Sequence, residues 1–166
     1  VQDAVAESLS GFGFDDQIGL AGFTNRLGGK LEPGIVSPVG PIKGAKETLV
    51  AKLRGLAPLA QTPLYEAVGQ GVDALADAYR SDAINAVVVL SGGPNDTTRP
   101  GSLDALQAKL QAQPAGKKVR VFAIAYGNQA DTDSLKAIAS ASGGEFFDAT
   151  DPKTLKDVLR DVAGSF

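Results

Sequence analysis

Residues 84–96 read INAVVVLSGGPND, and this stretch decides the fold. The run from Ile84 to Leu90 has no charged side chain and is apolar on both faces. That pattern is typical of a central strand in a parallel sheet that helices cover on both sides. The glycine-rich residues 91–96 predict a tight loop at the carboxyl end of the strand. Replacing Val88 with Asp should therefore bury an unpaired carboxylate and unfold the domain.

Outward from this strand, short apolar runs alternate with longer amphipathic segments. The apolar runs predict further strands at residues 17–24, 35–39, 119–126 and 145–148. The amphipathic segments predict helices at residues 1–12, 46–56, 63–79, 103–110, 131–142 and 151–162. Residues 17–24 read as a buried strand, and prolines near the 35–39 strand favour a sheet edge. Thr62 is predicted to cap the longest helix, with Pro63 at its first position.

This alternation predicts an α/β fold with a doubly wound, mostly parallel sheet, helices on both faces and one antiparallel edge strand. The length suits a single domain over residues 1–166. The net charge is −3, without a basic stripe, so nucleic-acid binding is not expected. Cysteine and histidine are absent, which excludes zinc fingers, thiol catalysis and Ser-His-Asp triads in this sequence. The longest apolar run, residues 121–126, is too short to insert into a membrane, and no leader is visible.

Three segments, taken in order, resemble the von Willebrand factor A-type family. They are residues 16–24 (DQIGLAGFT), 61–67 (QTPLYEA) and 85–96 (NAVVVLSGGPND), and residues 121–144 continue the match. The resemblance covers essentially the whole chain and is strongest to bacterial envelope proteins. It implies a non-catalytic, adhesion-type binding module, located outside the cell or in the cell envelope. Its partner would be a protein, a glycan or a neighbouring domain of the same protein.

The resemblance also implies a magnesium site, the metal-ion-dependent adhesion site (MIDAS), that this sequence does not complete. The family's first strand ends in Asp-x-Ser-x-Ser, but this chain begins inside the following helix, so the domain is expected to be N-terminally incomplete. The family's third-loop aspartate falls on Gly92, and only Thr62 of the usual ligand set remains. Mg²⁺ prefers carboxylate oxygens, whereas Thr62 and Ser91 supply neutral hydroxyls. Asp96 could reach the site only if its loop folds back, so we expect no metal and no cofactor.

In this family the first strand would lie at the centre of the sheet, between the strands at residues 17–24 and 84–90. Without that first strand, the strands at residues 17–24 and 84–90 would each carry unpaired backbone groups on the edges that face each other. Each unpaired group would cost about 1–3 kcal/mol. We therefore predict that another strand occupies this position. The alternative is that the two strands close up and pair directly.

The binding site is predicted at the C-terminal edge of the sheet, where ligands of doubly wound folds sit. The candidate residues are Thr24, Asn25, Thr62, Ser91, Gly92, Asn95, Asp96 and Asn128. Any one of these loops could equally be a solvated connection. Two other functions stay open, a nucleotide- or small-ligand-binding α/β domain and a purely structural domain of a larger envelope protein. Residues 90–93 favour the nucleotide hypothesis only weakly, because Gly-x-Gly-x-x-Gly and Gly-Lys-Ser/Thr are both missing.

Overall fold

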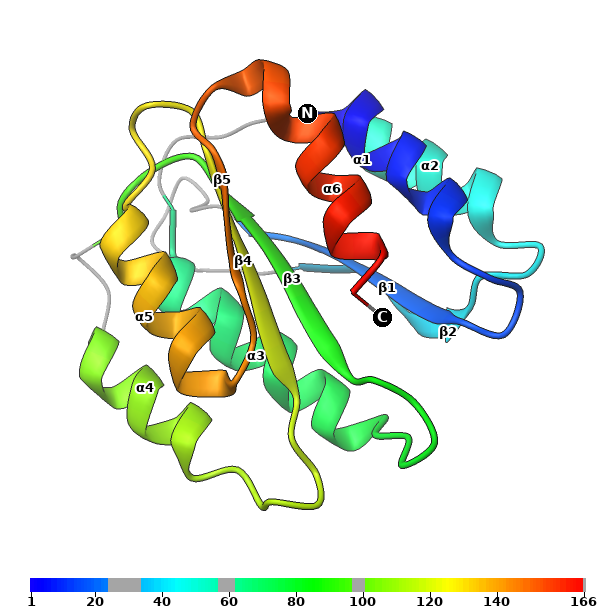
Figure 1. Cartoon of the computed structure of the whole chain (residues 1–166). Coiled ribbons are helices and arrows are strands. Elements are labelled where there is room, and N and C mark those ends of the chain that lie inside the picture. The colour runs from blue at the N-terminus through cyan, green and yellow to red at the C-terminus, as the bar shows by residue number, and fades with distance from the viewer. Residues whose placement is uncertain (24–33, 57–61, 97–100, 166) are drawn as a thin grey trace.

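The computed structural model describes residues 1–23, 34–56, 62–96 and 101–165, and Figure 1 shows their arrangement. The helices are α1 (Gln2–Ser8), α2 (Lys46–Arg54), α3 (Leu64–Asp77), α4 (Leu103–Gln111), α5 (Thr132–Ser142) and α6 (Leu155–Ala163). Two short 3-10 turns, η1 (Leu9–Gly11) and η2 (Pro152–Thr154), extend α1 and precede α6. The strands are β1 (Gln17–Gly22), β2 (Gly34–Pro41), β3 (Ala86–Ser91), β4 (Arg120–Tyr126) and β5 (Phe146–Ala149). The predicted alternation of strands and helices is confirmed.

The strands form two sheets. β3, β4 and β5 pair in parallel, in that order, with Val88 opposite Phe122 and Ala125 opposite Asp148. β1 and β2 pair antiparallel with an irregular register, and Pro38 lies within β2. The predicted fold class is therefore confirmed, including the antiparallel strand.

β4 is the centre of the parallel sheet. Val121, Ala123 and Ala125 point to one face and Phe122 and Ile124 to the other, and all five are buried. The first face packs against α3, α4 and α5, and the second against α6 and α1 (Figure 1). A strand between two helical layers must be apolar on both faces, which explains its sequence.

The β1–β2 hairpin belongs to a third, smaller cluster. Leu9, Ile42 and Leu49 form its buried centre, so the hairpin is held by η1 and α2 rather than by the parallel sheet. α1 contacts both α2 and α6 and thereby connects this cluster to the rest of the molecule. In Figure 1 the hairpin lies on the side of β3 away from β4 and β5.

Two burial predictions are wrong. β3 is an edge strand of its sheet, with Val88 41% exposed and Ile84, just before it, 46% exposed. β1 alternates exposed and half-buried residues and is not a buried strand. The physical reason is the same for both. A strand is fully buried only when other segments lie along both of its edges as well as over its faces. Among the described residues, β3 pairs only with β4, and β1 pairs only with β2.

The prediction that another strand occupies the position between β1 and β3 stays a prediction. Within the described ranges, no further strand lies there, and β1 and β3 do not pair with each other. Closing the two sheets together would pull the hairpin away from η1 and α2, where Ile18 and Leu20 pack. The apolar contacts of the third cluster therefore oppose closure.

Some helix ends are set by the local sequence. Ser102 caps α4, Asp131 caps α5 and Asp151 caps η2, each by accepting a backbone N–H within three residues. Gly143 ends α5 with φ of 75°, a conformation that glycine adopts without steric cost. None of the described helices is long and apolar enough to cross a membrane.

Candidate functional site

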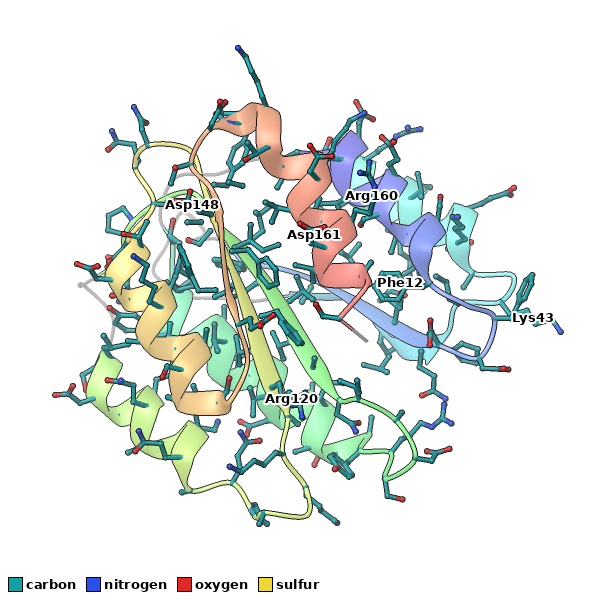
Figure 2. The ribbon with its side chains drawn as sticks, viewed as in Figure 1. Phe12, Lys43, Arg120, Asp148, Arg160 and Asp161 are labelled. Carbon is teal, nitrogen blue, oxygen red and sulfur yellow. The ribbon has the colours of Figure 1, made fainter. Side chains whose placement is uncertain are left out.

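The candidate site lies at the C-terminal edge of the parallel sheet. Because β3, β4 and β5 are parallel, their carboxyl ends and the loops that follow meet at this edge. Figure 2 shows Asp148 at this end of the sheet and Arg120 at the opposite end. Residues 92–96 follow β3, and the start of α3 lies against them.

The loop after β3 is joined to α3 by two hydrogen bonds. The Tyr65 backbone N–H donates to Oδ1 of Asn95 at 3.1 Å. The Asp96 N–H donates to the carbonyl oxygen of Thr62 at 2.8 Å. Tyr65 is the second residue of α3, so Asn95 supplies from a distant loop the bond that an N-cap side chain usually makes.

The prediction that Thr62 caps α3 is therefore wrong. Pro63 takes the N-cap position, the helix begins at Leu64, and no side chain of the cap residue bonds the helix. Thr62 instead uses its carbonyl oxygen, which accepts from the N–H groups of both Leu64 and Asp96. Asn95 can take over the capping role because the β3 loop lies across the helix start.

The Thr62 side chain meets the glycines of the same loop. A Cβ on Gly93 would lie 3.4 Å from the Thr62 hydroxyl oxygen, and one on Gly92 would lie 3.3 Å from the Tyr126 carbonyl oxygen. The buried Ser91 hydroxyl donates to the Gly93 carbonyl at 3.2 Å. The loop is thus packed closely between the start of α3 and the end of β4.

A second network, which the sequence analysis missed, joins α3 to α5. The Ser134 hydroxyl donates to Oδ2 of Asp131 at 2.7 Å and lies 3.0 Å from the Tyr65 hydroxyl. Since the one Ser134 hydroxyl proton goes to Asp131, Tyr65 is the donor to Ser134. No local sequence pattern indicates that Tyr65 reaches Asp131 through Ser134.

The remaining candidates do not join this assembly. Asn128 is exposed in the loop after β4. Thr24 and Asn25 lie outside the described residues. Of the eight predicted residues, the structure therefore brings together Thr62, Ser91, Gly92, Asn95 and Asp96.

One carboxylate at this edge has a shifted pKa. The Thr150 hydroxyl donates to Oδ1 of Asp148 at 2.6 Å, and the Thr150 N–H donates to the same oxygen at 2.9 Å. These two bonds hold the pKa of Asp148 below its ordinary value, because they stabilise the charged carboxylate. Asp148 lies on β5, two strands away from the β3 loop.

The donor set of the β3 loop does not match a magnesium site. Thr62 and Ser91 supply neutral hydroxyls, Gly92 has no side chain, and Asp96 is the one carboxylate among residues 91–96. In the part of the chain that the structure describes, no three His, Cys, Asp or Glu side chains are grouped so that they could hold a metal ion. The expectation of no metal stays a prediction.

Comparison with known families gives one match. The family model of the von Willebrand factor type A domain matches residues 4–161. No curated protein matches the chain at a significant level.

Several solved structures share the fold. A von Willebrand factor type A protein from Catenulispora acidiphila is 17% identical, with a TM-score of 0.72, over 98% of this chain and 36% of that protein. Proximal thread matrix protein 1 from the mussel byssus is 20% identical, with a TM-score of 0.67, over 98% of this chain and 41% of that protein. A second structure of the mussel protein, 17% identical with a TM-score of 0.63 over 98% and 39% of the two chains, has a zinc-occupied MIDAS motif.

A bacterial membrane protein is also similar. An aerotolerance-related membrane protein from Bacteroides fragilis is 11% identical, with a TM-score of 0.67, over 99% of this chain and 87% of that protein. This chain thus spans less than half of the Catenulispora and mussel proteins and most of the Bacteroides one. At these identities the likeness shows the fold alone.

Proposed function

This chain belongs to the von Willebrand factor type A family, and we propose that it is a non-catalytic binding module that recognises a protein through the C-terminal edge of its parallel sheet. The observation that carries the proposal is the cross-linked β3 loop. Asn95 and the Asp96 N–H bind it to α3, and the Gly93 backbone packs beside the Thr62 hydroxyl.

A loop held in this way suits binding because its conformation is set before a partner arrives. Ordering a flexible loop on binding costs about 0.5–1.5 kcal/mol for each side chain immobilised, and a preformed loop avoids part of that cost. Gly92 and Pro94 are exposed at its surface, and Asn128 is exposed in the next loop. Polar but mostly uncharged groups of this kind favour a protein partner, with a glycan or a neighbouring domain as alternatives.

Catalysis finds little support at this edge. Ser91 is buried and donates its hydroxyl proton to the Gly93 carbonyl, so it is not paired with a general base. The nucleotide hypothesis is tested by thermal shift with ATP, NAD and Mg²⁺ added separately. We expect the melting temperature to stay unchanged with all three. A saturable increase in the melting temperature with either nucleotide would favour the nucleotide-binding function instead.

We place this module outside the cell or in the cell envelope and expect it to work without a metal. The structures that share its fold include a membrane protein of Bacteroides and a protein of the mussel byssus, which supports this location. Zinc occupies the MIDAS motif of the mussel protein, but this chain has Gly92 and the neutral hydroxyls of Thr62 and Ser91. Recognition would then depend on hydrogen bonds and surface shape.

The binding surface is tested by site-specific photo-crosslinking. A photoreactive amino acid is placed at position 92 or 128, both exposed at the C-terminal edge, and at Lys117, which is exposed in the loop before β4 at the opposite edge. Each variant is incubated with an extract of envelope and secreted proteins, and adducts are identified by mass spectrometry.

We expect the same protein adduct from positions 92 and 128 and none from position 117. Asn95→Ala, which releases the loop from α3, should reduce the adduct yield at position 92. An adduct formed equally from position 117 would contradict the proposed surface, and an adduct of sugar alone would replace the protein partner with a glycan.

A further inference from the structure

Tyr65 is hydrogen-bonded towards both loops of the proposed binding surface. Its backbone N–H donates to Oδ1 of Asn95, in the loop after β3, at 3.1 Å. Its hydroxyl lies 3.0 Å from the Ser134 hydroxyl, which in turn donates to Oδ2 of Asp131 at 2.7 Å. Asp131 ends the loop after β4 and caps α5. One residue of α3 therefore connects the loop after β3 to the end of the loop after β4.

The pairing of β3 with β4 does not reach these two loops. The last paired residues of the two strands are Ser91 and Ala125. The ladder of backbone hydrogen bonds between β3 and β4 thus does not hold residues 92–96 against residues 128–131. Beyond the end of a ladder, a loop keeps its position through the contacts of its own residues. The bonds through Tyr65 are contacts of this kind.

The bond between Tyr65 and Ser134 is shielded from water. Ser134 is 6% exposed, and the partly buried Tyr65 ring packs against the apolar cluster that lies under α3, α4 and α5. Water therefore competes little for this bond, and the packing of the ring restricts where the hydroxyl can lie. The Ser134 N–H also donates to Oδ1 of Asp131 at 3.1 Å, so both carboxylate oxygens of Asp131 are held.

We infer that Tyr65 is the positioning residue of the proposed binding surface. It sets the spacing between the loops after β3 and β4, so that one molecule of the protein partner binds both loops at once. This role rests on the proposed function, which supplies the surface. The backbone N–H and the hydroxyl of Tyr65 are directed to Asn95 and Ser134, so Tyr65 acts through the loops. Loops that are already correctly spaced lose less conformational freedom when the partner binds.

A double crosslink tests whether one partner molecule covers both loops. A photoreactive amino acid is placed at positions 92 and 128 of the same chain, which is then incubated with the extract of envelope and secreted proteins. The mass of each adduct and its crosslinked peptides are measured by mass spectrometry. We expect one partner molecule for each chain, with both crosslinks on that molecule. Adducts that carry two partner molecules, one at each position, would overturn the inference.

Tyr65→Phe removes the hydroxyl that reaches Ser134 and keeps the backbone N–H that donates to Asn95. The matched control is Tyr79→Phe, just after the other end of α3, where the hydroxyl donates to the Gly116 carbonyl at 3.2 Å. Well below the melting temperature, Tyr65→Phe should reduce the adduct yield at positions 92 and 128 by at least about threefold, the effect of one lost hydrogen bond. Tyr79→Phe should leave both yields unchanged.

A role in stability alone predicts a different result. It would lower the melting temperature of Tyr65→Phe without changing the adduct yields of the folded chain. Unchanged yields with Tyr65→Phe, or equal losses with Tyr65→Phe and Tyr79→Phe, would therefore overturn the inference.

An NMR measurement without any partner distinguishes failure of this inference from failure of the proposed function. Relaxation dispersion detects backbone motion on the microsecond to millisecond timescale. Tyr65→Phe should introduce such motion at the amides of residues 128–131, and the parent and Tyr79→Phe should lack it. The absence of new motion in Tyr65→Phe would overturn the inference, even where the parent crosslinks to a partner. If no protein crosslinks to the parent, the proposed function fails, and the dispersion result still confirms or overturns the spacing role of Tyr65.

Discussion

At the scale of single residues, the β3 loop shows how one side chain can act on a distant helix. Asn95 accepts the Tyr65 N–H across a separation of 30 residues and does for α3 what Thr62 was expected to do. Any short polar side chain near a free N–H can serve as a cap, so position in space matters more than position in sequence.

Asn95→Ala should destabilise the chain by about 1 kcal/mol, because it leaves the Tyr65 N–H without its acceptor. In a domain of this size that loss lowers the melting temperature by about 2–4 °C. Thermal denaturation followed by circular dichroism measures it. Asn128→Ala, at an exposed asparagine of the same edge, is the control and should melt like the parent. Equal melting of both variants would show that Asn95 does not cap α3.

Val89→Asp should unfold the domain, and Val88→Asp should not. Val89 is 5% exposed within the α3-side core, so a carboxylate there loses its hydration at a cost on the order of 4 kcal/mol. Val88 is 41% exposed, and its replacement should cost no more than about 1 kcal/mol. Urea denaturation of the two variants distinguishes these outcomes. A larger loss for Val88→Asp would mean that the β3 edge is covered in solution.

At the scale of elements, helices α1 and α6 are joined by a surface ion pair as well as by their apolar faces. The Lys156 ammonium lies 2.7 Å from Oε2 of Glu7. The hydrogen bond and then the charge of Lys156 lower the pKa of Glu7, with a smaller effect from Arg160, and the same pair raises the pKa of Lys156. Both side chains are well exposed, so the pair contributes little at high salt.

The Glu7 pair predicts a pH-dependent contribution to stability. The folded-state pKa of Glu7 is lowered, so the contribution is present above the unfolded-state pKa and is lost as the pH falls through the folded-state pKa. Lys156→Met should lower the melting temperature slightly at pH 7 and low salt and not at all at about pH 2.5. It should also move the pKa of Glu7 up towards its ordinary value, which carboxyl-resolved NMR titration measures. Lys153→Met, an exposed lysine next to α6, is the control. An unchanged titration of Glu7 would contradict the pairing.

At the scale of the whole molecule, the two sheets and three apolar clusters determine where the functional groups lie. The parallel sheet brings the loops after β3 and β4 and the starts of α3 and α5 to one edge, where Asn95, Tyr65 and Ser134 form cross-links between them. The hairpin is attached through its own cluster, and it does not pair with β3. Metal binding is decided at this scale too, because its ligands must come from several loops at once.

The chain should show no saturable binding of Mg²⁺ or Mn²⁺ at millimolar concentration in isothermal titration calorimetry. The Thr62 and Ser91 hydroxyls are neutral, and a divalent cation needs carboxylate oxygens as well. Gly92→Asp alone should not create a site, although a Cβ fits there with a small shift of the Tyr126 carbonyl. The control is the same titration after dialysis against a chelator. A stoichiometric heat signal from the unmodified chain would overturn the prediction.

Local sequence determined the identity and order of the elements. The apolar run in residues 119–126 and the helical spacing in residues 131–142 depend on neighbours a few positions apart, and each prediction is confirmed. The gathering of Thr62, Ser91, Gly92, Asn95 and Asp96 followed as well, because the carboxyl ends of parallel strands share an edge.

Only the tertiary structure decided which apolar strand is central. β3 and β4 both have apolar sequences, yet β4 pairs on both sides, whereas β3 pairs on one side among the residues that the structure describes. It also decided that Asn95, rather than Thr62, caps α3, and that Tyr65 reaches Asp131 through Ser134. The physical reason is that the spacing of apolar residues indicates which face of an element is apolar. Strand pairing and helix capping depend instead on contacts between residues that lie far apart along the chain.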